Sequence, residues 1–96
     1  MIGLVAVLKI KPGFEEKVAE ATIKMAKVVR KEEKECLLYD PFVPLGRASE
    51  IYILEKYTSD KALEEHRSLP HYLAFRESIK DAVEGPPQVT LLESIG

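Results

Sequence analysis

The sequence lacks several features that mark whole classes of protein. Its 96 residues include no tryptophan, no asparagine, one glutamine and one cysteine, Cys36. A single cysteine cannot form an internal disulfide, so we expect a reducing, cytoplasmic location. No apolar stretch approaches the roughly 18 residues that a membrane span requires. We therefore expect no membrane partner.

A dominant charge is missing as well. The formal net charge is −2, and no run of lysine or arginine exceeds two residues. Nucleic acids and anionic membrane surfaces bind to basic patches, so we expect no nucleic-acid partner. The first residues, MIGLVAVLKIKPG, have no basic leading segment, and Lys9 interrupts their apolar run. This pattern predicts a strand rather than a secretory signal.

The motifs of cofactor and metal sites are also absent. The glycines are isolated, and no G-x-G-x-x-G pattern occurs, so nothing supports a nucleotide cofactor. His66 and His71 are five residues apart with Pro70 between them, which is poor spacing for one helical face. No cysteine or aspartate flanks them at ligand spacing. We expect no cofactor and no metal, and a packing role for Cys36 on a strand.

The order of strand and helix patterns is the most informative feature present. Residues 2–10 are aliphatic on both faces and are bounded by Pro12-Gly13, which predicts a strand covered on both sides. Residues 13–33 change to a helical period, with acidic residues in the first turn and basic residues near the end. The apolar stripe of this helix comprises Phe14, Val18, Ala21, Met25, Val28 and Val29.

Two further strands are expected in the middle of the chain. Residues 36–40 form the second predicted strand, which we expect to stop at Pro41. Residues 41–49 contain two prolines and a glycine and predict a loop. Residues 50–57 alternate in the manner of a third strand.

The last third predicts helix and then strand. Residues 58–60 offer N-cap groups for a short helix through His66, and a second helical start follows at Ser68. Residues 85–87, Gly-Pro-Pro, terminate the second helical pattern, and residues 89–95 predict the final strand. The stripe of that pattern comprises Tyr72, Phe75, Ile79 and Val83.

This order, βαββαβ, predicts a single ferredoxin-like α+β domain over residues 1–96. Four antiparallel strands would carry the helices on one face and leave the other face bare. Because the first and third strands are apolar on both sides, water should not cover that bare face. Packing two copies about a two-fold axis through the sheet face is the simplest remedy, so we expect a homodimer.

Histidines and aromatic residues gather around the third strand and the last helices. Histidine titrates near neutrality and can remove a proton from a phenol or a hydroxyketone. Tyrosine offers flat apolar contact and a hydroxyl, which suits an aromatic ligand. Each aromatic side chain taken singly also fits a simple packing role. The candidate catalytic residues are His66 and His71, and the candidate substrate-binding residues are Tyr39, Tyr52, Tyr57, Tyr72 and Phe75.

Part of this set has the spacing of a known family. The chain resembles the antibiotic biosynthesis monooxygenase superfamily, and the likeness runs over nearly its whole length. The resemblance implies a dimeric α+β barrel with a pocket in each subunit. Its features are Glu55-Lys-Tyr57, Ala62-Leu63, His66, Ser68, Pro70-His71-Tyr72 and Phe75, with Lys11-Pro12-Gly13 and residues 32–39 upstream.

The superfamily includes cofactor-free oxygenases of quinols and polyketide phenols, haem-degrading enzymes, and an isomerase of a phosphorylated signalling sugar. The asparagine and tryptophan on which the haem degraders and the polyketide oxygenases rely have no counterpart here, which argues above all against haem degradation. The resemblance thus implies a monooxygenase whose partners are a dihydroxyaromatic substrate and dioxygen. His66 or His71 would take a phenolic proton, and no flavin or metal would be needed.

Two alternatives stay open. The first alternative is an isomerase of a phosphorylated hydroxyketone, in which the same histidines would move protons beside a carbonyl and Arg47 or Arg67 would hold the phosphate. The second alternative is a non-catalytic dimeric module that binds a ligand.

Overall fold

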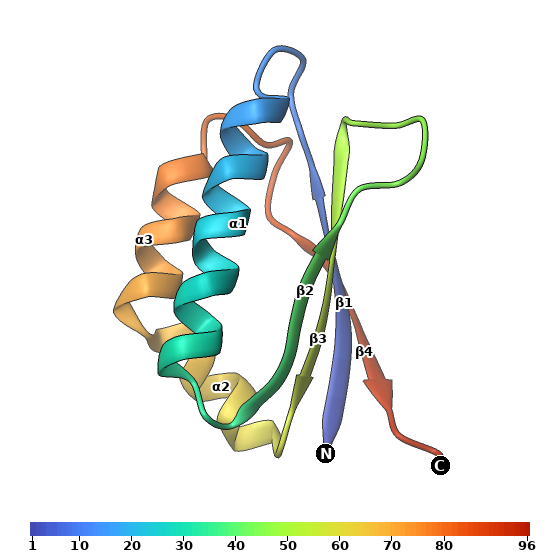
Figure 1. The fold of residues 1–96 in the computed structure, drawn as a ribbon, viewed down its shortest axis with the longest axis vertical. Coiled ribbons are helices and arrows are strands. Elements are labelled where there is room, and N and C mark those ends of the chain that lie inside the picture. Colours follow the sequence, from blue (N-terminus) through green and yellow to red (C-terminus); the bar gives the residue numbers. More distant parts are fainter.

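The computed structural model describes residues 1–96 as one antiparallel sheet layered against helices, and Figure 1 shows all the helices on the same face. The strand order is β2-β3-β1-β4. The predicted ferredoxin-like α+β fold is confirmed. Its elements are β1 Ile2–Lys9, α1 Glu15–Glu32, β2 Cys36–Phe42, β3 Glu50–Tyr57, α2 Asp60–Ser68, α3 Pro70–Ile79 and β4 Gln88–Glu93.

Several element ends differ from the sequence-based expectation, and two of the differences have a physical cause in the fold. Strand β2 continues through Pro41 to Phe42 instead of stopping at the proline. Because β2 lies at the edge of the sheet, the proline's missing N–H removes no obligatory ladder bond. Helix α3 ends at Ile79, although its apolar stripe continues to Val83. Val83 instead forms an isolated antiparallel bridge with Ile10, which ties the segment after α3 to the end of β1.

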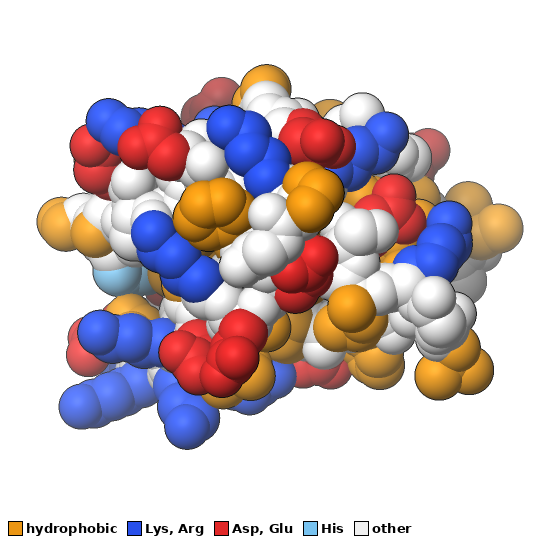
Figure 2. All heavy atoms as spheres, turned by 90° about the horizontal axis from the view of Figure 1, so that it is seen from above, with side chains coloured by type: hydrophobic (Ala, Val, Ile, Leu, Met, Phe, Trp, Pro, Cys, Tyr) orange, Lys and Arg blue, Asp and Glu red, His pale blue; other side chains and the backbone are white.

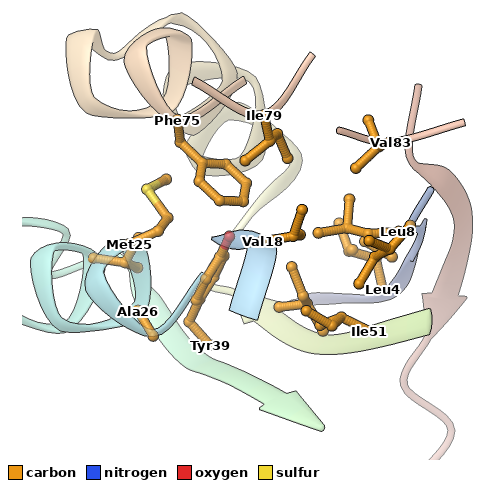
Figure 3. Packing of buried hydrophobic residues seen from close by; sticks show 14 of the residues in the cluster. Leu4, Leu8, Val18, Met25, Ala26, Tyr39, Ile51, Phe75, Ile79 and Val83 are labelled. Atoms are coloured by element: carbon orange, nitrogen blue, oxygen red, sulfur yellow. The ribbon is translucent and has the colours of Figure 1, made fainter. Parts of the chain in front are cut away.

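The core lies between the sheet and the helices. The inward faces of β1 and β3 bury alternate residues, as the two-residue period of a strand requires. Helix α1 buries Val18, Met25 and Val29 of the predicted stripe against them, whereas Phe14 precedes the helix and is exposed. Figure 3 shows Phe75 and Ile79 of α3 packed toward the same interior. This packing fixes α2 and α3 over the sheet.

The opposite face of the sheet has no helix over it (Figure 1). Directly opposed residues of antiparallel strands share a face, so the register places their side chains. Phe42 is 54% exposed there. We call this surface the outer sheet face; its apolar members are Val5, Val7, Leu38, Phe42, Tyr52, Leu54 and Leu92.

One end of the molecule gathers the segments that matter for chemistry. The turn after α1, helix α2 and the start of α3 lie together at the end where both termini are found (Figure 1). The other end, seen from above in Figure 2, shows acidic, basic and apolar side chains interspersed, without a large area of one charge. No helix combines the length and the apolar character that crossing a bilayer would demand.

Candidate functional site

Helix α2 carries His66 into the interior. The Ser59 hydroxyl caps the helix by accepting a hydrogen bond from the Ala62 N–H at 3.1 Å. Ala62, Leu63 and His66 follow a helical spacing, and all three are buried against the sheet. Only 2% of His66 is exposed, so its ring needs hydrogen-bond partners inside the protein.

Glu33, the residue just after α1, supplies such a partner. Its side chain is only 7% exposed. Its carboxylate oxygens lie 2.7 and 2.9 Å from Nδ1 of His66. One of them lies 2.5 Å from Nε2 of His71, at the start of α3. A single carboxylate therefore bridges two histidines, and the break at Pro70 turns both toward it.

This bridge selects the tautomer of His66. An ionised carboxylate only accepts hydrogen bonds, so the imidazole nitrogens that face Glu33 carry the hydrogens. Nε2 of His66 is then left with a free lone pair, 4.0 Å from Oε1 of Glu55. Burial lowers the pKa of His66, and the hydrogen bond and negative charge of Glu33 work in the opposite direction. His66 is thus a neutral base with one nitrogen held and one available.

Glu55 of β3 is a buried carboxyl group beside that free nitrogen. Residues two apart on a strand share a face, so Tyr57 lies next to it, and its hydroxyl donates a 2.6 Å hydrogen bond to Oε1. Burial raises the pKa of Glu55 to about 7, and the Tyr57 bond and the positive charge of Arg67 limit the rise. Burial also raises the pKa values of Tyr57 and Tyr39 above their usual range, so both phenols keep their protons.

Three tyrosine rings enclose the His66 imidazole. Their centroids lie 5.7 Å (Tyr39), 5.3 Å (Tyr57) and 5.0 Å (Tyr72) from its own. Figure 3 shows Tyr39 directed from β2 into the interior. The rings come from a strand at the edge, a strand in the middle of the sheet and a helix. They fix the orientation of the base and exclude bulk water from it.

A cavity of about 30 Å³ lies between the sheet and helices α2 and α3. That volume is about the space of one water molecule, whereas ligand pockets measure about 300–1,000 Å³. A larger hollow of about 570 Å³ lies next to it, between α3 and the segment that leads to β4. Four residues border both spaces: Leu8, Tyr72, Arg76 and Pro87. The walls of the small cavity include Tyr39, Glu55, His66, Arg67, Tyr72, Phe75 and Arg76.

The structure brings most of the predicted site residues together. Tyr39, His66, Tyr72 and Phe75 border the small cavity. Tyr57 contacts His66 from the side on which Glu33 lies.

Two predicted residues lie elsewhere. His71 faces a groove between α1 and α3, on the far side of Glu33. Tyr52 points to the outer sheet face, where it pairs with Val7 and Phe42 and borders a different hollow.

Sequence reasoning missed Glu33 and did not assign a role to Glu55. Glu33 lies within KEEKE, a run of charges that has the composition of a solvated helix end, and no pattern singles it out. The sequence pattern does contain a signal for Glu55, because strand alternation places it on the same face as Ile51, Ile53 and Tyr57. A carboxyl group on an otherwise apolar strand face indicates a buried ionisable residue, and such residues commonly have a functional role.

Comparisons with known proteins agree with this architecture. The family model described as antibiotic biosynthesis monooxygenase matches residues 1–78. The proposed monooxygenase Rv0793 of Mycobacterium tuberculosis is 37% identical over 60 residues, which cover 62% of this chain and only 58% of that protein. The solved structure of Rv0793 gives a TM-score of 0.89 at 27% identity, over 99% of this chain and 95% of the other.

A proposed antibiotic biosynthesis monooxygenase from Caulobacter crescentus gives a TM-score of 0.91 at 25% identity, over 99% of this chain and 90% of the other. A structure from Nitrosomonas europaea, at 20% identity and a TM-score of 0.91, shares the fold. Because the family model spans most of the sequence and the solved structures superpose over nearly all of it, the chain belongs to the antibiotic biosynthesis monooxygenase family.

Proposed function

We propose that the protein is a cofactor-independent monooxygenase that oxidises a quinol or another dihydroxyaromatic compound with dioxygen. The supporting observation is the arrangement of His66. Glu33 holds its Nδ1, while Nε2 faces the cavity with its lone pair free. A phenol with a pKa near 10 is mostly protonated at neutral pH, so a positioned base is what its ionisation requires.

The first step is the transfer of a phenolic proton to Nε2 of His66. The imidazolium that forms is stabilised by the negative charge of Glu33, as in other imidazole–carboxylate pairs. A substrate hydroxyl placed between Nε2 and Oε1 of Glu55, which are 4.0 Å apart, is within reach of both groups. The tyrosine rings keep water from competing for the phenolate.

The phenolate then reduces dioxygen. For a hydroquinone, one oxygen atom enters the ring to give a hydroxyquinone and the other leaves as water. The substrate supplies all four electrons, so the balance needs no external reductant. The protein's contribution is the base, the orientation of the ring and the exclusion of water.

Oxygen uptake tests this proposal. Protein dialysed against a chelator and checked for bound flavin is mixed with a panel of hydroquinones, alongside His66→Gln and His71→Gln. We expect enzyme-dependent uptake that falls by about 100-fold or more in His66→Gln, because general base catalysis contributes that much. His71→Gln should lose less, since His71 borders a different groove. Turnover that depends on added flavin or metal contradicts the proposal.

One observation favours a second candidate, the isomerase of a phosphorylated hydroxyketone. Arg67 borders the cavity, where it could hold a phosphate. Arg47 does not, since it lies 3.6 Å from Glu50 beside the hollow that Tyr52 borders. Turnover of a hydroxyketone phosphate that disappears with the dephosphorylated compound would support the isomerase. Ligand binding without turnover, unchanged in both histidine variants, would favour a non-catalytic module.

We further propose that the protein forms a homodimer through the outer sheet face. That face is lined by aliphatic and aromatic side chains, no helix covers it, and Phe42 and Leu92 are 54% and 46% exposed on it. Apolar surface of this kind is stabilised by burial against a partner. The most economical partner is a second copy related by a two-fold axis.

A further inference from the structure

Two arginines border the His66 cavity, one from each helix above it: Arg67 from α2 and Arg76 from α3. The chain has four arginines. Arg30 pairs with Asp40 at 2.8 Å and Arg47 approaches Glu50 at 3.6 Å, whereas Arg67 and Arg76 have no carboxylate within 4.0 Å. The arginines without a carboxylate partner are thus the two at the cavity.

Arg76 makes one side-chain hydrogen bond, which its Nη1 donates to the hydroxyl of Tyr72 at 2.9 Å. The two residues are four apart on α3, and the guanidinium lies 5.8 Å from the centre of the Tyr72 ring. Both side chains border the small cavity and the larger hollow beside it. The Tyr72–Arg76 pair therefore lies, together with Leu8 and Pro87, along the boundary between the two spaces.

We infer that the ligand of this site carries a carboxylate that binds Arg76 and Arg67 while its hydroxylated ring lies against His66. This inference rests on the proposed function, because the ring and the base are those of the quinol reaction. A carboxylate accepts two parallel hydrogen bonds from a guanidinium, whereas the Tyr72 hydroxyl accepts one. The anionic group is consequently the better partner for Arg76 and displaces Tyr72 from it.

Displacement of Tyr72 would also enlarge the cavity, which is otherwise too small for the proposed ligand. The cavity of about 30 Å³ is too small for an aromatic ring. When Tyr72 leaves Arg76, the boundary opens on their side and the cavity widens toward the hollow of about 570 Å³. An anionic ligand thereby favours the opening of the space that it occupies, while a neutral ligand of the same size must break the Tyr72–Arg76 hydrogen bond without an equivalent replacement.

The charges around His66 also favour a ligand that carries a carboxylate. The positive charge of Arg67 acts to lower the pKa of both His66 and Glu55. A bound carboxylate offsets that charge and leaves His66 a stronger base than in the ligand-free protein. The groups that face His66 come from every element around it: Glu33 from the turn after α1, Arg67 from α2, His71 and Tyr72 from α3, and Tyr39, Glu55 and Tyr57 from the sheet.

Calorimetric titration without oxygen tests the inference, with 2,5-dihydroxybenzoate and 2,5-dihydroxybenzamide as probes. The two share ring and hydroxyls and differ in charge. We expect the benzoate to bind at least 10-fold more tightly, because hydrogen bonds between charged partners are the stronger kind. Arg67→Gln should weaken the benzoate by about 10-fold or more and leave the benzamide unchanged. Arg76→Gln should weaken the benzoate by a similar factor but not the benzamide, because this variant also frees Tyr72 from its hydrogen bond. Arg47→Gln, on the other side of the sheet, is the matched control.

The outcomes separate this inference from the proposed function. Equal affinity for the two probes overturns the carboxylate site, whether or not oxygen uptake is seen. Tight, arginine-dependent binding of the benzoate, without uptake in air from the benzoate or from any hydroquinone of the panel, supports the carboxylate site and removes the oxygenase. Dihydroxyacetone phosphate and dihydroxyacetone form a second pair of probes. If that phosphate binds through Arg76 and the benzoate does not, the anionic ligand is not aromatic and the inference is overturned.

Discussion

At the scale of single residues, Glu33 decides which nitrogen of His66 is free to act. Replacing Glu33 by glutamine keeps the size of the side chain and removes its negative charge. We expect kcat/KM to fall by about 100-fold, because the imidazolium loses its stabilising partner. The pKa of His66 should fall further, so the acidic limb of the pH profile moves to lower pH.

The exposed neighbour provides the control for this change. Glu32→Gln removes the same charge from the same turn, but Glu32 makes no contact with either histidine. Its pH profile should match that of the unmodified protein. If Glu33→Gln retains full activity and an unmoved acidic limb, then Glu33 has no role in the base.

Glu55 makes stability depend on pH. Its pKa is about 7 in the folded protein against 4.5 when freely solvated, so the folded state holds a proton that the unfolded state releases. Its contribution is therefore complete below about pH 4.5 and is lost as the pH rises toward 7. The loss is on the order of 3 kcal/mol. Urea unfolding at pH 5 and pH 8 should show Glu55→Gln gaining stability relative to wild type at the higher pH.

Glu55→Gln keeps an acceptor for the Tyr57 hydroxyl and removes only the ionisable carboxyl group. A difference between the two proteins that stays constant from pH 5 to pH 8 would rule out Glu55 as the titrating group. His66, which lies 4.0 Å away, titrates in the opposite sense because its pKa is lowered by burial.

At the scale of helices and strands, α2 holds the base in place through its cap. Ser59→Ala removes the hydroxyl that accepts from the Ala62 N–H and should lower the free energy of unfolding by about 1 kcal/mol. It should also reduce kcat, because α2 carries His66. Urea midpoints and initial rates measure the two effects. Ser49→Ala, at an exposed serine with no side-chain hydrogen bond, should change neither.

The elements were largely predictable from sequence because each follows a local pattern. The stripe of α1 and the alternation of β3 are local properties, and the structure confirms the alternation and the centre of the stripe, but not Phe14 at its start. The end of β2 depended on its position at the sheet edge, where Pro41 costs no ladder bond. The end of α3 depended on the bridge between Val83 and Ile10, two residues far apart in sequence.

The candidate site was less predictable than the elements, because it depends on contacts between residues far apart in the sequence. Histidine and tyrosine are recognisable as chemical groups wherever they lie, and strand alternation alone aims Tyr39 inward and Tyr52 outward once the register is known. The register is set by pairing between strands. Glu33 is linked to His66 across 33 positions by tertiary packing, so no local pattern contains that contact.

At the scale of the whole molecule, the outer sheet face sets the assembly. Phe42→Glu and Leu92→Glu each place a charge within the proposed interface and should shift the protein from dimer to monomer. Light scattering coupled to size exclusion measures the mass. Leu45→Glu, at a fully exposed loop position, is the control and should leave the mass unchanged. A single monomeric mass for the unmodified protein would contradict the dimer.

The tyrosine enclosure also has an optical consequence. With no tryptophan in the chain, all intrinsic emission comes from four tyrosines, and three of them surround His66. A ligand that stacks among these rings changes most of the chromophores at once, and a quinone formed there accepts excitation from its neighbours. The site is therefore its own spectroscopic reporter. Binding and turnover can be followed by ultraviolet fluorescence without an attached label, and Tyr52→Phe would remove the one background emitter on the outer sheet face.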